Sequence, residues 1–84
     1  MEIDYHGLRL FEARNKICDD LIEAFETGAS EVILVHGFKH GSSIKSYIWG
    51  INGLSKDLRR IRPDIKIGIQ KGRSRSVTTI IFKV

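Results

Sequence analysis

The sequence has little of what marks several common classes of protein. Its one cysteine, Cys18, excludes a disulfide within the chain and every zinc site built from several cysteines. No apolar run approaches the roughly 18–20 residues that a membrane-spanning helix needs, and the acidic start, Met1 to Asp4, has no apolar targeting core. We therefore expect a cytoplasmic protein that does not contact a membrane.

Nucleotide-binding signatures and repeats are missing as well. The sequence lacks the Gly-x-x-x-x-Gly-Lys-Ser/Thr loop, gives no support for dinucleotide binding, and shows no repeat, linker or low-complexity segment. Its 84 residues, 42% of them hydrophobic, are enough for one domain with its own core. We expect one domain, residues 1–84.

Acidic residues are scarce in the second half of the chain. Residues 45–84 carry ten Lys and Arg against two acids, a net charge of +8, whereas residues 1–44 carry four against eight, a net charge of −4. This asymmetry predicts a face, built by the second half, that binds a polyanion. The alternative is a solvated surface over which the charges are scattered.

The spacing of apolar residues predicts an α/β fold. Apolar positions three and four residues apart indicate a helix from Leu10 to Thr27, which Gly28 ends. The other expected elements are strands 1–5, 31–35, 65–69 and 77–84, a helix capped by Ser42 or Ser43 that breaks at residues 50–53, and a shorter helix stopped at Pro63. The order β-α-β-α(α)-β-β predicts a mixed four-stranded sheet with helices packed on it.

Two details of packing follow from the same pattern. The continuous apolar run 31–35 is typical of a strand buried on both faces. Tyr47 and Trp49 lie in a helix with apolar neighbours, which favours a core or half-buried position over a role in stacking on bases.

Two His-Gly pairs follow expected strands. Asp4 and His6 alternate onto one side of the first strand, where the carboxylate can orient the imidazole for proton transfer. His36 follows the second strand, and if the two strands are neighbours, all three side chains converge at one end of the sheet. The alternative is that Asp4 caps a turn and His6 is an ordinary turn residue.

Two loops have the composition of phosphate-binding segments. Gly37 and Gly41 bracket a turn that leads into a helix N-terminus, where backbone N–H groups favour a phosphate, and Lys39 and His40 add polar partners. The loop 71–76 between the last two strands is basic. The expected phosphate contacts are Gly7, Gly37, Lys39, His40, Gly41, Ser42, Lys45, Lys71, Arg73 and Arg75.

Together these motifs resemble a known family. Residues 3–8, Ile-Asp-Tyr-His-Gly-Leu, followed by Glu12-Ala13, are similar to its Leu-Asp-x-His-Gly-Leu…Glu-Ala signature. Residues 32–37, Val-Ile-Leu-Val-His-Gly, followed by Ile44-Lys45, are similar to its hydrophobic-His-Gly-x-Gly-x-Gly…Leu-Arg signature. The family is the Smr (small MutS-related) domain, and the resemblance covers essentially the whole chain.

The resemblance implies a two-layer α/β sandwich like the C-terminal domain of translation initiation factor 3. It also implies nucleic-acid binding and, in several members, endonuclease activity on DNA or RNA. Asp4 and His6 match the positions linked to cleavage, while His36, Gly37 and Gly41 match the second motif. The chain departs from the family where Lys39 replaces the middle glycine.

The function expected from the sequence is cleavage of phosphodiester bonds by Asp4, His6 and His36. On RNA the two histidines and a 2′-hydroxyl could work without metal, whereas on DNA a divalent ion such as Mg²⁺ at Asp4 is the expected cofactor. One alternative is a module that binds nucleic acid without cleaving it. Another is a protein-interaction domain with a basic face.

Overall fold

The computed structural model describes residues 1–37 and 42–83. Its elements, in chain order, are β1 (Glu2–Asp4), α1 (Leu10–Glu26), β2 (Glu31–Val35), α2 (Ser42–Trp49), α3 (Leu54–Ile61), β3 (Lys66–Lys71) and β4 (Val77–Lys83). These bounds lie within two residues of the predicted ones, and the last strand was expected to include Val84, which lies outside the described residues. None of the described helices combines the length and the apolar character needed to cross a membrane.

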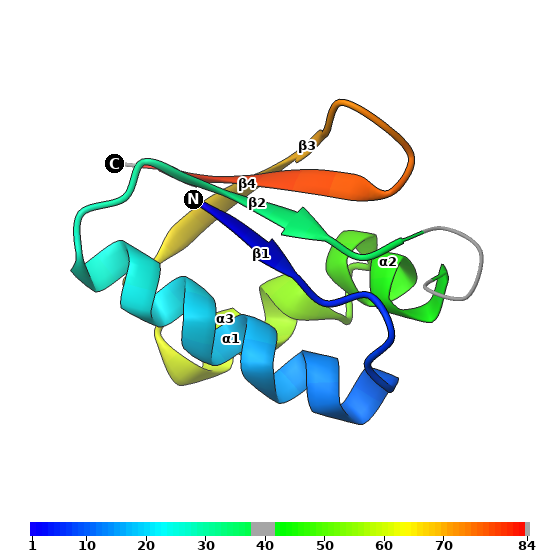
Figure 1. Ribbon diagram of the computed structural model, residues 1–84. Coiled ribbons are helices and arrows are strands. Elements are labelled where there is room, and N and C mark those ends of the chain that lie inside the picture. Colours follow the sequence, from blue (N-terminus) through cyan, green and yellow to red (C-terminus); the bar gives the residue numbers. More distant parts are fainter. Residues whose placement is uncertain (38–41, 84) are drawn as a thin grey trace.

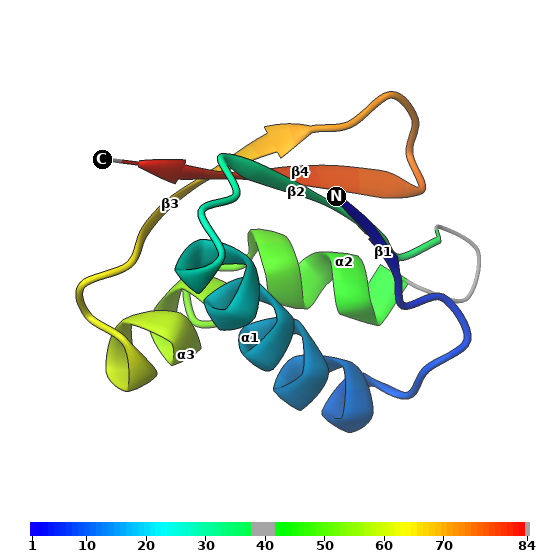
Figure 2. The same cartoon turned by 60° about the vertical axis from the view of Figure 1, so that its left-hand side comes forward.

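The four strands form one mixed sheet in the order β1-β2-β4-β3. The edge strand β1 runs parallel to β2, while β4 is antiparallel to both β2 and β3. The three helices lie on one side of this sheet and leave its other face open (Figures 1 and 2). The predicted α/β class, with a mixed four-stranded sheet and helices packed on it, is confirmed.

Helix α1 is the long helix expected from the apolar spacing. It buries Ala13, Ile17 and Leu21, which recur at four-residue steps and therefore share one face. The helix ends as predicted at Gly28, which takes a φ of +88° and so allows the chain to turn back toward the sheet. Its buried face and the inner face of the sheet make the core.

The sheet is buried on one face only, which corrects the expectation for residues 31–35. Val32 and Leu34 are fully buried beneath the helices, but Ile33 and Val35, on the opposite face, are only half-buried. The apolar run is continuous because this outer face is also apolar, although none of the described helices covers it. Alternation along β2 thus decides which side chains enter the core.

The predicted break between the second and third helices lies at Gly53. A Cβ atom added there would overlap the backbone carbonyl of Tyr47, so only glycine permits this close approach of the two segments. Tyr47 itself is buried, as expected, and its hydroxyl donates to Asp57 at 2.8 Å.

The short edge strand β1 is fixed to the helical layer by one side chain. Tyr5, directly after the strand, is fully buried, and its hydroxyl donates to the Asp20 carboxylate of α1 at 2.7 Å. Burial and this carboxylate raise the pKa of Tyr5, so the hydroxyl stays protonated and donates. The anchor places the residues on either side of Tyr5, Asp4 and His6, on the opposite, exposed side.

Candidate functional site

Asp4 and His6 form an exposed hydrogen-bonded pair at the end of β1. Asp4 Oδ1 accepts hydrogen bonds from the backbone N–H of His6 at 2.9 Å and from His6 Nδ1 at 2.6 Å. A carboxylate can only accept, so Nδ1 carries the proton and Nε2 is the nitrogen left to meet a substrate. The bond from the His6 ring is the main cause that holds the pKa of Asp4 below its ordinary value.

Gly37 lies beside this pair because β1 and β2 are parallel neighbours. The pairing sets Asp4 opposite Val35, and the Tyr5 N–H donates to the Val35 carbonyl at 2.7 Å. Gly37 has a φ of +75°, and a Cβ atom built on it would lie 3.6 Å from the Cβ of His6. The structure therefore brings Asp4, His6 and Gly37 together, whereas the sequence predicts that His36 is the third member of the group.

His36 is also at this end of the sheet, but its side chain points into the core. It is 0% exposed. Its Nδ1 lies 2.6 Å from the Gly37 carbonyl and its Nε2 lies 2.8 Å from Thr78 Oγ1 of β4. Both ring nitrogens are thus engaged inside the protein, which argues against the predicted direct role of His36 in proton transfer to a substrate.

The hydrogen bonds around His36 fit one neutral form of the ring. Burial, followed by the nearby Lys45 charge, lowers the pKa of His36, although the bond to Gly37 opposes this. In the neutral ring Nδ1–H donates to the Gly37 carbonyl and Nε2 accepts from the Thr78 hydroxyl. Thr78 Oγ1 in turn accepts from Trp49 Nε1–H at 2.9 Å. This series of hydrogen bonds gives a partner to each polar side-chain atom of His36, Thr78 and Trp49. It also connects the end of β2 to β4 and α2.

The start of β4 closes the site from the other side. The Ser76 carbonyl accepts hydrogen bonds from the backbone N–H groups of His36 at 2.8 Å and Gly37 at 3.1 Å. The loop between β3 and β4 consequently meets the end of β2, and the end of β1 lies beside them (Figures 1 and 2). The Asp4–His6 pair and the His36 network therefore share one end of the sheet with this loop.

A basic groove of about 420 Å³ lies between α2 and the β3–β4 hairpin. Three cations that were predicted to bind phosphate line it: Lys45 of α2, Lys71 at the end of β3, and Arg75 of the loop. Within residues 1–37 and 42–83 none of the three forms an ion pair. Its other lining residues are Trp49, Gly72, Ser74, Val77 and Thr78.

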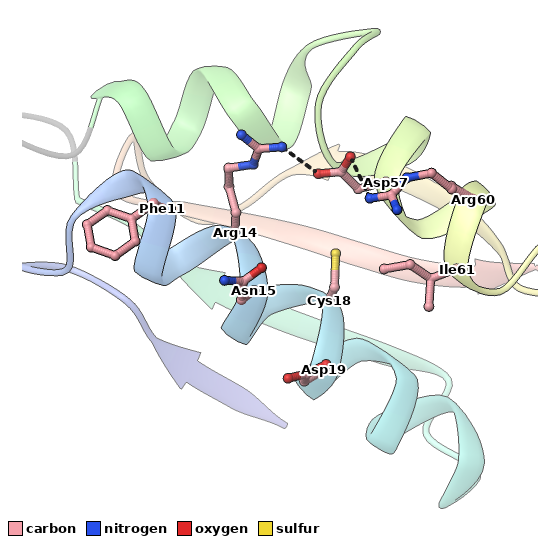
Figure 3. Close-up of a pocket in the computed structure, with 8 residues that line it drawn as sticks. All are labelled: Phe11, Arg14, Asn15, Cys18, Asp19, Asp57, Arg60 and Ile61. Carbon is pink, nitrogen blue, oxygen red and sulfur yellow. Dashed lines mark hydrogen bonds and ion pairs between the residues drawn. The ribbon is translucent and has the colours of Figure 1, made fainter.

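A second hollow, of about 380 Å³, separates α1 from α3 and has a different character (Figure 3). Its central carboxylate, Asp57, is shared by Arg14 at 3.3 Å, Arg60 at 3.7 Å and the Tyr47 hydroxyl. These bonds hold the pKa of Asp57 below its ordinary value, chiefly through Tyr47. The charges here compensate one another and join three helices, whereas those of the basic groove do not.

The remaining predicted site residues have varied positions. Arg73 is ion-paired with Glu2 of β1 at 2.9 Å, and Gly7 takes a φ of +86° in the turn after His6. Ser42 is the first residue of α2, while the predicted contacts Lys39, His40 and Gly41 lie outside the described residues. Within residues 1–37 and 42–83, no three His, Cys, Asp or Glu side chains are grouped so that they could hold a metal ion.

Two residues of the site were missed from the sequence. Trp49 is 39% exposed in the groove, whereas a core or half-buried position was favoured over a stacking role, and Thr78 was not singled out. A signal for Thr78 was present, because it shares the inward parity of Ile80 and is therefore a buried hydroxyl that needs a polar partner. Trp49 follows Lys45 by one helical turn, which places both on the groove side of α2.

Comparison with solved structures gives a match along the whole chain. The crystal structure of the Smr domain of Thermus thermophilus MutS2 superposes with a TM-score of 0.66 at 21% sequence identity, covering 99% of this chain and 98% of that chain. No family model and no curated protein sequence matches. The chain is therefore an Smr-like domain in its fold.

Proposed function

We propose that this chain is a member of the Smr family that binds nucleic acid through the basic groove and cleaves a phosphodiester bond with His6. The observation that carries the proposal is the position of the exposed Asp4–His6 pair at the same end of the sheet as three cations that form no ion pair within the described residues. Phosphate contacts by Lys and Arg supply the affinity, and the imidazole supplies the chemistry.

His6 acts as the proton acceptor through Nε2. The attacking hydroxyl, from water or from a ribose 2′-OH, loses its proton to Nε2 while its oxygen bonds to phosphorus and the bond to the leaving oxygen breaks. The leaving oxygen then takes a proton from His6 or from water. Asp4, bonded to Nδ1, orients the ring and stabilises the imidazolium that forms in between.

His36 is a positioning residue in this proposal. Its ring is bonded to the Gly37 carbonyl, and its backbone N–H, like that of Gly37, is bonded to Ser76. These contacts fix the backbone turn that lies against His6. A buried neutral imidazole serves this purpose without touching the substrate.

Asp4 offers one carboxylate oxygen to a divalent cation. Both hydrogen bonds from His6 go to Oδ1, so Oδ2 is the atom through which Asp4 could contact the ion. Mg²⁺ usually binds through one or two carboxylates together with phosphate oxygens of the substrate. Such an ion would activate water and neutralise charge on the phosphate.

Cleavage tests the catalytic half of the proposal. Labelled single-stranded RNA, duplex RNA, single-stranded DNA and supercoiled plasmid are incubated with the wild type and with His6→Ala, each with and without EDTA. We expect His6→Ala to reduce cleavage by about 10²–10⁴-fold, since that is the usual contribution of a general base. A 2′,3′-cyclic phosphate product that forms in EDTA identifies attack by the 2′-hydroxyl.

Equal cleavage by His6→Ala and the wild type would remove His6 from the mechanism. Salt-sensitive binding without cleavage of any of the four substrates would reduce the chain to a binding module. These two outcomes are distinguishable because binding is measured on the same samples.

Salt dependence tests the binding half. The triple variant Lys45→Ala, Lys71→Ala, Arg75→Ala is expected to lower the slope of log K against log salt by about 2–3, because each phosphate contact contributes about 0.7–0.9. The matched control removes three cations from α3 and the start of β3, in Lys56→Ala, Arg59→Ala, Lys66→Ala. Equal losses in both variants would show diffuse attraction and no groove.

A further inference from the structure

Trp49 has an environment that packing alone does not explain. It is a large aromatic side chain, 39% exposed, and it lines a groove together with Lys45, Lys71 and Arg75. Exposed apolar side chains scattered singly are ordinary, but an aromatic ring framed by cations is the combination that proteins use to hold single strands.

The ring of Trp49 is held in place from behind. Its Nε1–H donates to Thr78 Oγ1 at 2.9 Å, and Thr78 is itself fully buried and bonded to His36. One edge of the indole is therefore fixed to β4, and the exposed part of the ring lines the groove. A ring fixed in this way loses little conformational freedom when a ligand stacks on it.

The opposite wall of the groove depends on close packing in the hairpin. A Cβ atom added to Gly72 would overlap the side chain of Val77, so the chain after β3 lies directly against the start of β4. Ser74 and Arg75 are thereby kept beside the groove. A volume of about 420 Å³ is within the range of small-ligand sites.

We propose that this groove binds an unpaired nucleotide, with its base stacked on Trp49 and the neighbouring phosphates on Lys45, Lys71 and Arg75. The inference rests on the proposed function, since it requires that the chain binds nucleic acid. A base inside a duplex already stacks on its neighbours and is not available to Trp49. The groove therefore selects single strands and unpaired positions within duplexes.

The sheet fixes where cleavage falls relative to that base. The groove borders β4 and β3, whereas His6 follows β1, two strands away from β4 in the order β1-β2-β4-β3. Neighbouring strands are about 4.8 Å apart, so the strand of nucleic acid crosses roughly 10 Å between the stacked base and His6. Cleavage is expected within a few nucleotides of the unpaired base.

The fluorescence of Trp49 tests the stacking directly, because it is the one tryptophan of the chain. We titrate the protein at low salt with a single-stranded oligonucleotide, a long duplex of the same sequence, that duplex with one bulged nucleotide, and a nucleoside monophosphate. We expect quenching by the single strand and the bulged duplex and little by the perfect duplex. Quenching by the monophosphate alone would show a pocket for free nucleotides and overturn strand binding.

Variants separate stacking from structure. Trp49→Ala is expected to weaken binding of the single strand by about 5- to 150-fold and binding of the perfect duplex by less than about twofold. Trp49→Phe keeps a stacking ring and therefore retains most of the affinity, although it lacks the N–H that donates to Thr78. Phe11→Ala, which removes another exposed aromatic from the α1–α3 hollow, is the matched control and leaves binding unchanged.

The two proposals fail differently. If the single strand and the perfect duplex bind equally, without quenching, and Trp49→Ala affects both alike, the stacking site is wrong while nucleic-acid binding stands. If neither binds at any salt concentration, both proposals are overturned.

Discussion

The two His-Gly pairs of this chain have opposite environments although each follows a strand. The side chain of His6 is 68% exposed and bonded to a carboxylate, whereas His36 is fully buried and bonded to a carbonyl and a hydroxyl. The difference comes from the alternation of side chains between the two faces of the sheet. His36 continues the inward series of Val32 and Leu34, while His6 lies on the side of the sheet opposite the buried Tyr5.

This comparison shows that a motif predicts where a residue lies more reliably than what it does. Both histidines reach the same end of the sheet, but one has a free nitrogen at the surface and the other has none. The buried histidine stabilises the turn beside which the exposed one lies.

The largest expected difference between the two histidines is in folding stability. His36→Ala leaves a cavity and deprives Thr78 of its partner, so we expect the free energy of unfolding to fall by about 2–4 kcal/mol. His6→Ala removes an exposed side chain and is expected to change it by less than about 0.5 kcal/mol. Urea unfolding of both variants measures the contrast.

Equal costs for these two variants would contradict the buried position of His36. If His36→Ala does not fold, His36→Asn, which keeps a polar side chain, provides the milder comparison. His6→Ala remains the control in either case.

A smaller effect is expected when the partner of His6 is changed. Asp4→Asn keeps the shape of the side chain but removes the charge that stabilises the imidazolium. An exposed charge pair is worth up to about 1 kcal/mol, so cleavage should fall by about fivefold while nucleic-acid binding is retained. Glu31→Gln, which removes one acid from the start of β2, is the matched control. Equal cleavage by Asp4→Asn and by this control would show that the pair is only structural.

The smallest effect is a pH dependence of stability that the buried histidine produces. The pKa of His36 is lowered in the fold. As pH falls below about 6.5, His36 therefore binds a proton in the unfolded chain while it stays neutral in the folded chain. The free energy of unfolding therefore decreases from pH 7 toward pH 5, by at most about 1.4 kcal/mol per pH unit. The carboxylates with lowered pKa, such as Asp4, lose their contribution only at lower pH.

Urea unfolding between pH 7.5 and 5 checks this slope. His36→Asn should flatten it. A wild type whose stability is constant over this range would show that His36 is not held neutral by the fold.

Most of the fold was predictable because the period of the apolar residues differs between helices and strands. The spacing in α1, the stop at Gly28 and the break at Gly53 are local properties of the sequence, and all three are confirmed. The half-exposed outer face of β2 was not predictable, since an apolar run does not reveal how many helical layers the chain supplies.

The site was predictable where it depends on strand ends and less so where it depends on contacts between distant segments. Asp4 and His6 are two residues apart, so alternation alone places them together. The Thr78 hydroxyl, in contrast, joins His36 to Trp49 across 42 and 29 residues of sequence. No local pattern could show that these three side chains share one buried hydrogen-bond chain.

The position of His6 after β1 has a consequence for how the Asp4–His6 pair would come apart. This strand has three residues, lies at the edge of the sheet and is paired on one side only. Segments with few contacts open locally at a much lower free energy than the core does. If the Tyr5–Asp20 bond breaks, Asp4 and His6 can leave their places while β2, β4 and β3 remain paired. The amides of residues 2–6 should then exchange with solvent well before those of β4, and the Asp4–His6 pair would be lost before the domain unfolds.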